Sequence, residues 1–223
     1  MAANRLCALM LLPVLAVSGG IAHGQSRQQR PLAANPSVFV AADIGFGRLA
    51  QDRGLAAAVK QYGEAEAQLV SPHGAQGNVL AKDWAKQVPS AFRLQPQMVL
   101  VSCDGNIAVT KGEWTAADQR GPYLSVWTRD DKGRLKWRVH QRSLRQATAD
   151  GASVAEADED EFIRSRQAAC SPKAARETGA AFGQDGSLKW TVQTVAGGGS
   201  ALHVQIWNGQ EMETVISPAM ELA

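Results

Sequence analysis

The spacing of the apolar residues changes once along the chain, near residue 90, and this change constrains the fold most. After residue 90, apolar and polar residues alternate, as they do in a half-buried strand. A chain that is helical first and strand-forming later is typical of the α+β class. Before residue 90, apolar residues recur at the three- and four-residue spacing of an amphipathic helix, at Phe39, Ala42, Phe46, Leu49, Leu55, Val59 and Tyr62.

The first part of the mature chain predicts three helices. The first begins after Pro36, and Asp52 caps the second, which Gly63 ends. The third is short, covers residues 79–87, and is ended by Pro89. A short extended stretch, residues 67–71, lies between the second and the third.

The second part predicts hairpins of antiparallel strands. Asp104-Gly105, Asp130 to Gly133 and Asn208-Gly209 are turn sequences placed between apolar runs. Strands joined by tight turns pair in antiparallel fashion. The expected strands are residues 98–102, 107–114, 123–128, 135–140, 188–195, 202–207 and 212–216.

The first 24 residues have the pattern of a signal peptide. One charge, Arg5, precedes an apolar run at residues 6–17, and Ala22-His23-Gly24 fits a small-x-small cleavage site. The alternative is a membrane anchor, but a spanning helix needs about 20 apolar residues. We therefore expect a periplasmic or secreted protein without a membrane span in its mature chain.

The chain after the signal peptide reads as a single domain with an insertion. We expect a flexible N-terminus at residues 25–36, a first folded part at 37–142 and a loop or helix insertion at 143–186. Residues 187–223 are the C-terminal β extension of the same domain.

Composition excludes some partners. Lys and Arg number 23 against 21 Asp and Glu, which gives no electrostatic reason to expect nucleic acid as a partner. In an exported chain Cys103 and Cys170 are candidates for a disulfide, and two buried thiols are the alternative. No histidine lies near either cysteine at the spacing of a zinc site. The acidic run at 156–161 lacks the glycine and the alternating ligands of an EF-hand loop. We expect no metal ion and no cofactor.

The order of elements resembles the nuclear transport factor 2-like superfamily, which includes SnoaL-like and ketosteroid-isomerase-like domains. The resemblance runs from Phe39 to about Arg142. It is carried by residues 43–46 (DIGF), 54–58 (GLAAA), 66–72 (EAQLVSP), 111–114 (KGEW), 123–127 (YLSVW) and 133–137 (GRLKW). The resemblance implies a cone-shaped fold, with three N-terminal helices against a curved antiparallel sheet and a pocket between them.

The isomerase branch of this superfamily uses two carboxyl groups, a base and a protonated donor. The matching positions here are Ser71, before Pro72, and Ser125. Serine has no proton-accepting form near neutral pH without a neighbouring base, so this chain departs from the isomerase pattern at both positions. The resemblance therefore implies the fold but not the isomerase reaction.

His73 is the remaining titratable candidate at the expected pocket mouth, with Ser71 as a hydrogen-bond donor beside it. The alternative is a solvent-exposed loop histidine. For Asp43 the polar face of the first helix is a sufficient explanation. For His140 and His203, alternation with apolar residues predicts the solvent face.

All six tryptophans follow residue 80, and indoles on a concave sheet either line a pocket or fill the core. The side chains expected to line the pocket are Phe46, Trp84, Trp114, Tyr123, Ser125 and Trp127.

Three functions remain open. The first is a binding or accessory domain for a small, partly apolar molecule. The second is a periplasmic enzyme of isomerase or hydrolase type that uses His73 as acid or base. The third is an interaction module that forms a homodimer through the outer sheet face, which exposed Trp190 and Trp207 would favour.

Overall fold

The structure is a computed structural model that describes residues 34–72, 79–86, 92–117, 119–143, 162–170 and 185–217. The predicted signal peptide, most of the predicted flexible N-terminus, His73 and most of residues 143–186 lie outside these ranges. Within them, none of the helices is both long and apolar enough to span a membrane.

In the described part of the chain, two helices come before the first strand, and a single helical turn follows the second strand. The side chain of Asn35 caps α1 (Pro36–Arg53) by accepting a hydrogen bond from the Ser37 amide at 3.1 Å. Gly54, with φ of 84°, separates α1 from α2 (Leu55–Tyr62) because the left-handed region suits glycine. The third predicted helix, α3 (Ala81–Trp84), has only four residues.

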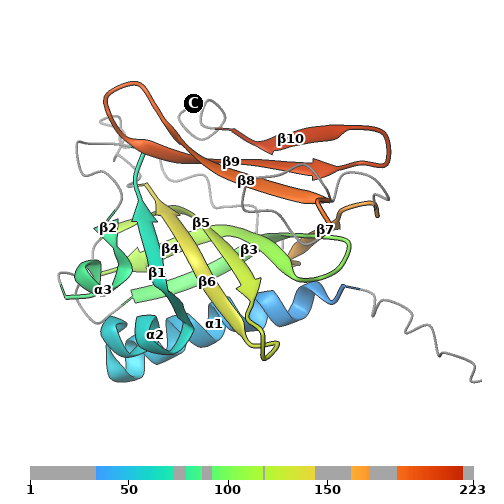
Figure 1. The fold of residues 1–223 in the computed structure, drawn as a ribbon. Helices are drawn as coiled ribbons and strands as arrows, with labels where there is room; N and C mark the ends of the chain where they lie inside the picture. The colour runs from blue at the N-terminus through green and yellow to red at the C-terminus, as the bar shows by residue number, and fades with distance from the viewer. Residues whose placement is uncertain are drawn as a thin grey trace, which may run out of the picture. The chain divides into compact units, whose positions relative to one another are not determined.

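Within the described ranges, ten strands form two sheets (Figure 1). The larger sheet has the order β2-β1-β6-β5-β4-β3-β7, and the smaller has the order β10-β9-β8. The strands of the larger sheet are β1 (Gly63–Val70), β2 (Val79–Leu80), β3 (Phe92–Val101), β4 (Ile107–Ala116), β5 (Gln119–Arg129), β6 (Leu135–Arg142) and β7 (Arg164–Gln167). Those of the smaller sheet are β8 (Leu188–Thr194), β9 (Ser200–Trp207) and β10 (Met212–Ile216).

The sheet-rich α+β class is confirmed, but the prediction of an antiparallel sheet is wrong at two places. β1 pairs with β6, and β3 with β7, in parallel. Neither pair is joined by a tight turn, and turn sequences predict only pairings between consecutive strands. The larger sheet is therefore mixed.

Each face of the larger sheet has its own apolar core. On what we call the inner face, buried side chains pack against α1, α2 and α3, including Phe39 and Phe46 of α1 and Trp84 of α3. On the outer face, residues such as Val126 of β5 pack with Leu202 of β9. The larger sheet is thus covered by helices on one face and by β8–β10 on the other (Figure 1).

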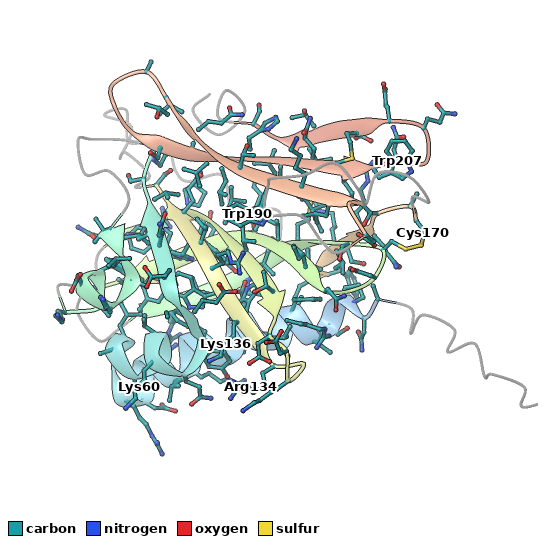
Figure 2. The ribbon with its side chains drawn as sticks, in the orientation of Figure 1. Lys60, Arg134, Lys136, Cys170, Trp190 and Trp207 are labelled. Atoms are coloured by element: carbon teal, nitrogen blue, oxygen red, sulfur yellow. A yellow bond between two sulfur atoms is a disulfide. The ribbon has the colours of Figure 1, made fainter. Side chains whose placement is uncertain are left out.

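Hydrogen bonds attach the smaller sheet to the larger sheet, and a disulfide links the residues that follow β3 and β7. The Ser200 amide donates to the Ser71 carbonyl at 2.8 Å, and the Leu202 amide donates to Oε1 of Gln141. Cys103 and Cys170 form a disulfide, which confirms one of the two alternatives for this pair (Figure 2).

The smaller sheet contains two tryptophans of the C-terminal strands, Trp190 in β8 and Trp207 in β9. Trp190 is only 8% exposed, and Trp207 is half-buried. The exposed tail tryptophans that would favour an interaction module are therefore not found.

A bulge in β6 breaks the predicted alternation of that strand. Val126 pairs with Val139, but its neighbour Trp127 pairs with Trp137, so β6 carries one extra residue, Arg138. An extra residue turns all later side chains to the opposite face. Trp137 accordingly belongs to the inner core, whereas Val139 belongs to the outer core.

Candidate functional site

A carboxyl group is fully buried on the inner face. Asp43 of α1 accepts a hydrogen bond from the Tyr123 hydroxyl at 2.8 Å and another from Nε1 of Trp127 at 2.8 Å. The prediction that Asp43 lies on the polar face of its helix is wrong. It follows Phe39 by four residues and precedes Phe46 by three, so it occupies the apolar stripe. That spacing was readable in the sequence.

Burial dominates the electrostatics of this carboxyl. Loss of hydration raises the pKa of Asp43 from 3.8 to about 6, although hydrogen bonds from Thr110, Tyr123 and Trp127 lower it in part. Burial, together with the charge of Asp43, raises the pKa of Tyr123 well above its ordinary value. Tyr123 therefore remains a hydrogen-bond donor, while Asp43 changes its charge close to neutral pH.

A histidine lies beside this carboxyl cluster. His140 is 3% exposed, its Nδ1 lies 2.9 Å from Oγ of Ser125, and its ring stacks on Tyr123 at a centroid distance of 5.6 Å. Burial, and less strongly the charge of Arg142, lowers its pKa from 6.5 to about 3, so the ring is neutral at physiological pH. The prediction that His140 faces solvent is wrong because the β6 bulge turns it inward. His203, the other strand histidine, is only partly buried.

An arginine is held by two indoles next to His140. Cζ of Arg142 lies 5.2 Å from the ring centroid of Trp84 and 5.0 Å from that of Trp114. A guanidinium between two aromatic faces is fixed in position without losing its donors. Burial lowers its pKa. Among the described residues, no carboxylate forms an ion pair with Arg142.

Three nitrogen atoms of this region are buried without a hydrogen-bond partner in the described part of the chain. They are Nε1 of Trp84, Nε1 of Trp137 and Nε2 of His140. Trp137 and His140 line a small void together with Asp43 and Ser125, and this void has no room for a water molecule. The buried polar groups of native proteins are nearly always hydrogen-bonded. This cluster therefore offers hydrogen bonds that the described residues leave unmade.

The structure brings the predicted pocket-lining residues together. Phe46, Trp84, Trp114, Tyr123, Ser125 and Trp127 are all buried, and the five aromatic residues belong to one core on the inner face. That they contact a ligand stays a prediction.

Of the predicted acid–base pair, only Ser71 lies in the part of the chain that the structure describes. Ser71 follows the end of β1, where its carbonyl accepts from Ser200 of β9, and His73 lies outside the described residues. Sequence reasoning missed Asp43, His140 and Arg142. Across the described ranges, His, Cys, Asp and Glu side chains nowhere form a group of three that could hold a metal ion.

Comparisons with known proteins give fold neighbours only. No family model matches the chain, and no curated protein matches it. A solved NTF-2 like protein of unknown function from Silicibacter pomeroyi is similar over 50% of this chain and 99% of its own, at 16% identity and a TM-score of 0.40. A nuclear transport factor 2 (NTF2-like) superfamily protein from Salmonella enterica is similar over 52% of this chain and 95% of its own, at 16% identity and a TM-score of 0.37.

Proposed function

We propose that this chain is a small-molecule-binding domain that holds a partly apolar carboxylate between the inner face and its helices. The observation that carries the proposal is the set of three unpartnered ring nitrogens at Trp84, Trp137 and His140. A buried donor without an acceptor costs about 1–3 kcal/mol, and a ligand oxygen in this region would remove that cost.

Arg142 supports a negatively charged ligand. Its guanidinium is fixed between Trp84 and Trp114, and no described carboxylate pairs with it. Arginine forms paired hydrogen bonds with carboxylates, and indole faces accept the apolar body of such a molecule. Because the inner void has no room for water, ligand entry requires the surrounding rings to move.

The binding of 3-phenylpropanoate tests this proposal, with the neutral 3-phenylpropanamide as a matched probe. Calorimetric titration is expected to show binding of the acid and at least about tenfold weaker binding of the amide. Arg142→Gln is expected to remove that preference. Arg53→Gln, at the exposed end of α1, is the control and should leave it intact. Equal binding of acid and amide by the unchanged protein would contradict the proposal.

A second candidate function is acid–base catalysis on the same ligand, and the pKa of Asp43 favours it. A carboxyl group with a pKa of about 6 can accept or donate a proton near neutral pH. The version that uses His73 with Ser71 stays a prediction. Activity of the binding domain toward a carbonyl-bearing acid should follow the titration of Asp43 and be lost in Asp43→Asn. A pH profile that does not change in this variant would exclude Asp43 as the acid–base group.

We also propose that the protein is exported to the periplasm or outside the cell. The disulfide supports this, because such bonds persist in oxidising compartments. N-terminal sequencing of the protein recovered from an expressing bacterium tests this export proposal, and Gln25 is expected as the first residue. A homodimer through the outer sheet face has less support, because β8–β10 cover that face.

A further inference from the structure

A second cavity lies on the other side of the larger sheet, where the edge of that sheet meets β8. It has a volume of about 410 Å³, which is the size of many small-molecule sites. None of its lining residues lines the inner void. The lining residues are Glu64, Glu66, Gln68, Arg138, Val139, Trp190 and Val192.

Irregular strand pairing accompanies this cavity. Between β1 and β6, Gly63 pairs with Trp137 and Gln68 pairs with Val139, so the ladder is interrupted over the residues between them. The bulge at Arg138 falls in the same place. Bulges recur beside functional sites because they redirect side chains and end local pairing. Here they interrupt the regular ladder beside Glu64, Glu66 and Arg138, which line the cavity.

The charges that line the cavity leave one negative charge in excess. Nε of Arg138 donates to Oε2 of Glu64 at 2.7 Å, and the Thr128 hydroxyl donates to Oε1 of the same carboxylate. The carboxylate of Glu64 therefore already has a hydrogen-bond donor on each oxygen. Glu66 is exposed and forms no ion pair within the described part of the chain. Two carboxylates against one guanidinium favour a ligand with a single positive charge.

Apart from Gln68, the remaining lining is apolar, and it includes an unpartnered donor. Val139 of β6 faces Val192 and Trp190 of β8 across the cavity lining. Trp190 lies between β8 and the larger sheet (Figure 2). It is 8% exposed, and its Nε1 is buried without an acceptor among the described residues. An indole of this kind attracts a cation to its face and an oxygen to its edge.

We propose that this cavity binds a small organic ammonium ion with an apolar body. The ammonium group pairs with Glu66, and the apolar body lies against Trp190 and Val192. This site differs from the inner site in its residues and in the charge it selects. It stands whether or not the inner face binds a carboxylate.

Titration with phenethylammonium tests the proposal, and the uncharged 2-phenylethanol serves as the matched probe. The readout is the indole N–H resonance of Trp190 in a ¹H–¹⁵N spectrum, assigned with Trp190→Phe. Phenethylammonium is expected to shift that resonance in a saturable manner, and 2-phenylethanol is expected to bind at least about tenfold more weakly. Glu66→Gln should weaken phenethylammonium binding by about tenfold.

Glu211→Gln is the control variant, because Glu211 is exposed in the turn before β10 and does not line the cavity. It should bind phenethylammonium as the unchanged protein does. The proposal is overturned if the Trp190 resonance does not respond to millimolar phenethylammonium. It is also overturned if both probes bind equally or if Glu66→Gln binds with unchanged affinity. Since Glu66 is exposed, its replacement should not disturb folding.

Discussion

The two faces of the larger sheet are both buried, but among the described residues three unpartnered ring nitrogens lie on the inner face and one, Nε1 of Trp190, lies on the outer side. On the outer face the buried Gln141 accepts a hydrogen bond from the Leu202 amide, which helps to hold β9 against the larger sheet. On the inner face Asp43 accepts hydrogen bonds from Tyr123 and Trp127, while the ring nitrogens of Trp84, Trp137 and His140 lack partners in the described ranges. Gln141 therefore belongs to a structural contact between the two sheets, and the inner face is where we propose that a carboxylate binds.

The largest expected effect concerns the disulfide that links the residues after β3 and β7. Cys103 and Cys170 are 67 residues apart, and cross-linking a loop of that length stabilises the folded state by about 4 kcal/mol in the chain-entropy model. The double variant Cys103→Ala, Cys170→Ala should lose about this amount in urea unfolding. The unchanged protein treated with a reducing agent is the control and should match the variant. A loss of unfolding free energy below about 1 kcal/mol would contradict the prediction that the disulfide stabilises the folded state.

The next prediction concerns the pH dependence of stability, to which the buried Asp43 and His140 of the inner face contribute in opposite directions. The folded state raises the pKa of Asp43 from 3.8 to about 6, so its contribution to stability is present below pH 3.8 and is lost as pH rises through about 6. The folded state lowers the pKa of His140 from 6.5 to about 3, so its contribution is present above pH 6.5 and is lost as pH falls toward 3. Near pH 5 the two slopes have opposite signs and nearly cancel.

Single variants should uncover each slope in urea unfolding at several pH values from 4 to 6. In Asp43→Asn the free energy of unfolding should rise with pH by about 1.4 kcal/mol per unit more than in the unchanged protein. In His140→Gln it should fall with pH by a similar added amount. Two variants with the slope of the unchanged protein would contradict the account of these groups.

The smallest expected effect tests the outer face. Gln141→Leu removes the acceptor of the buried Leu202 amide, which should cost about 1–3 kcal/mol of unfolding free energy. Binding of 3-phenylpropanoate should not change, because Gln141 faces away from the inner core. Gln205→Leu, on the partly exposed side of β9, is the control and should cost much less. If Gln141→Leu weakened binding, the two faces would not be independent.

The sequence predicted most of the local structure and little of the site. The strands of the C-terminal hairpins begin and end within two residues of the predicted bounds, because Asn208-Gly209 and the alternating residues before it act locally. The β6 bulge and the parallel pairings depend on strands far away in the sequence. His140 and Arg142 could not be assigned to the inner face without them. Asp43 differs, since its place on the apolar stripe of α1 was visible in the spacing.

The indole resonances of the six tryptophans offer the most direct test of the central proposal, that the inner face binds a carboxylate. Trp84, Trp114, Trp127 and Trp137 belong to the inner core, whereas Trp190 and Trp207 lie in β8 and β9. In a ¹H–¹⁵N spectrum, 3-phenylpropanoate should shift the resonances of Trp84 and Trp114 and leave those of Trp190 and Trp207 in place. Shifts confined to Trp190 and Trp207, or no shifts at millimolar ligand, would contradict the account.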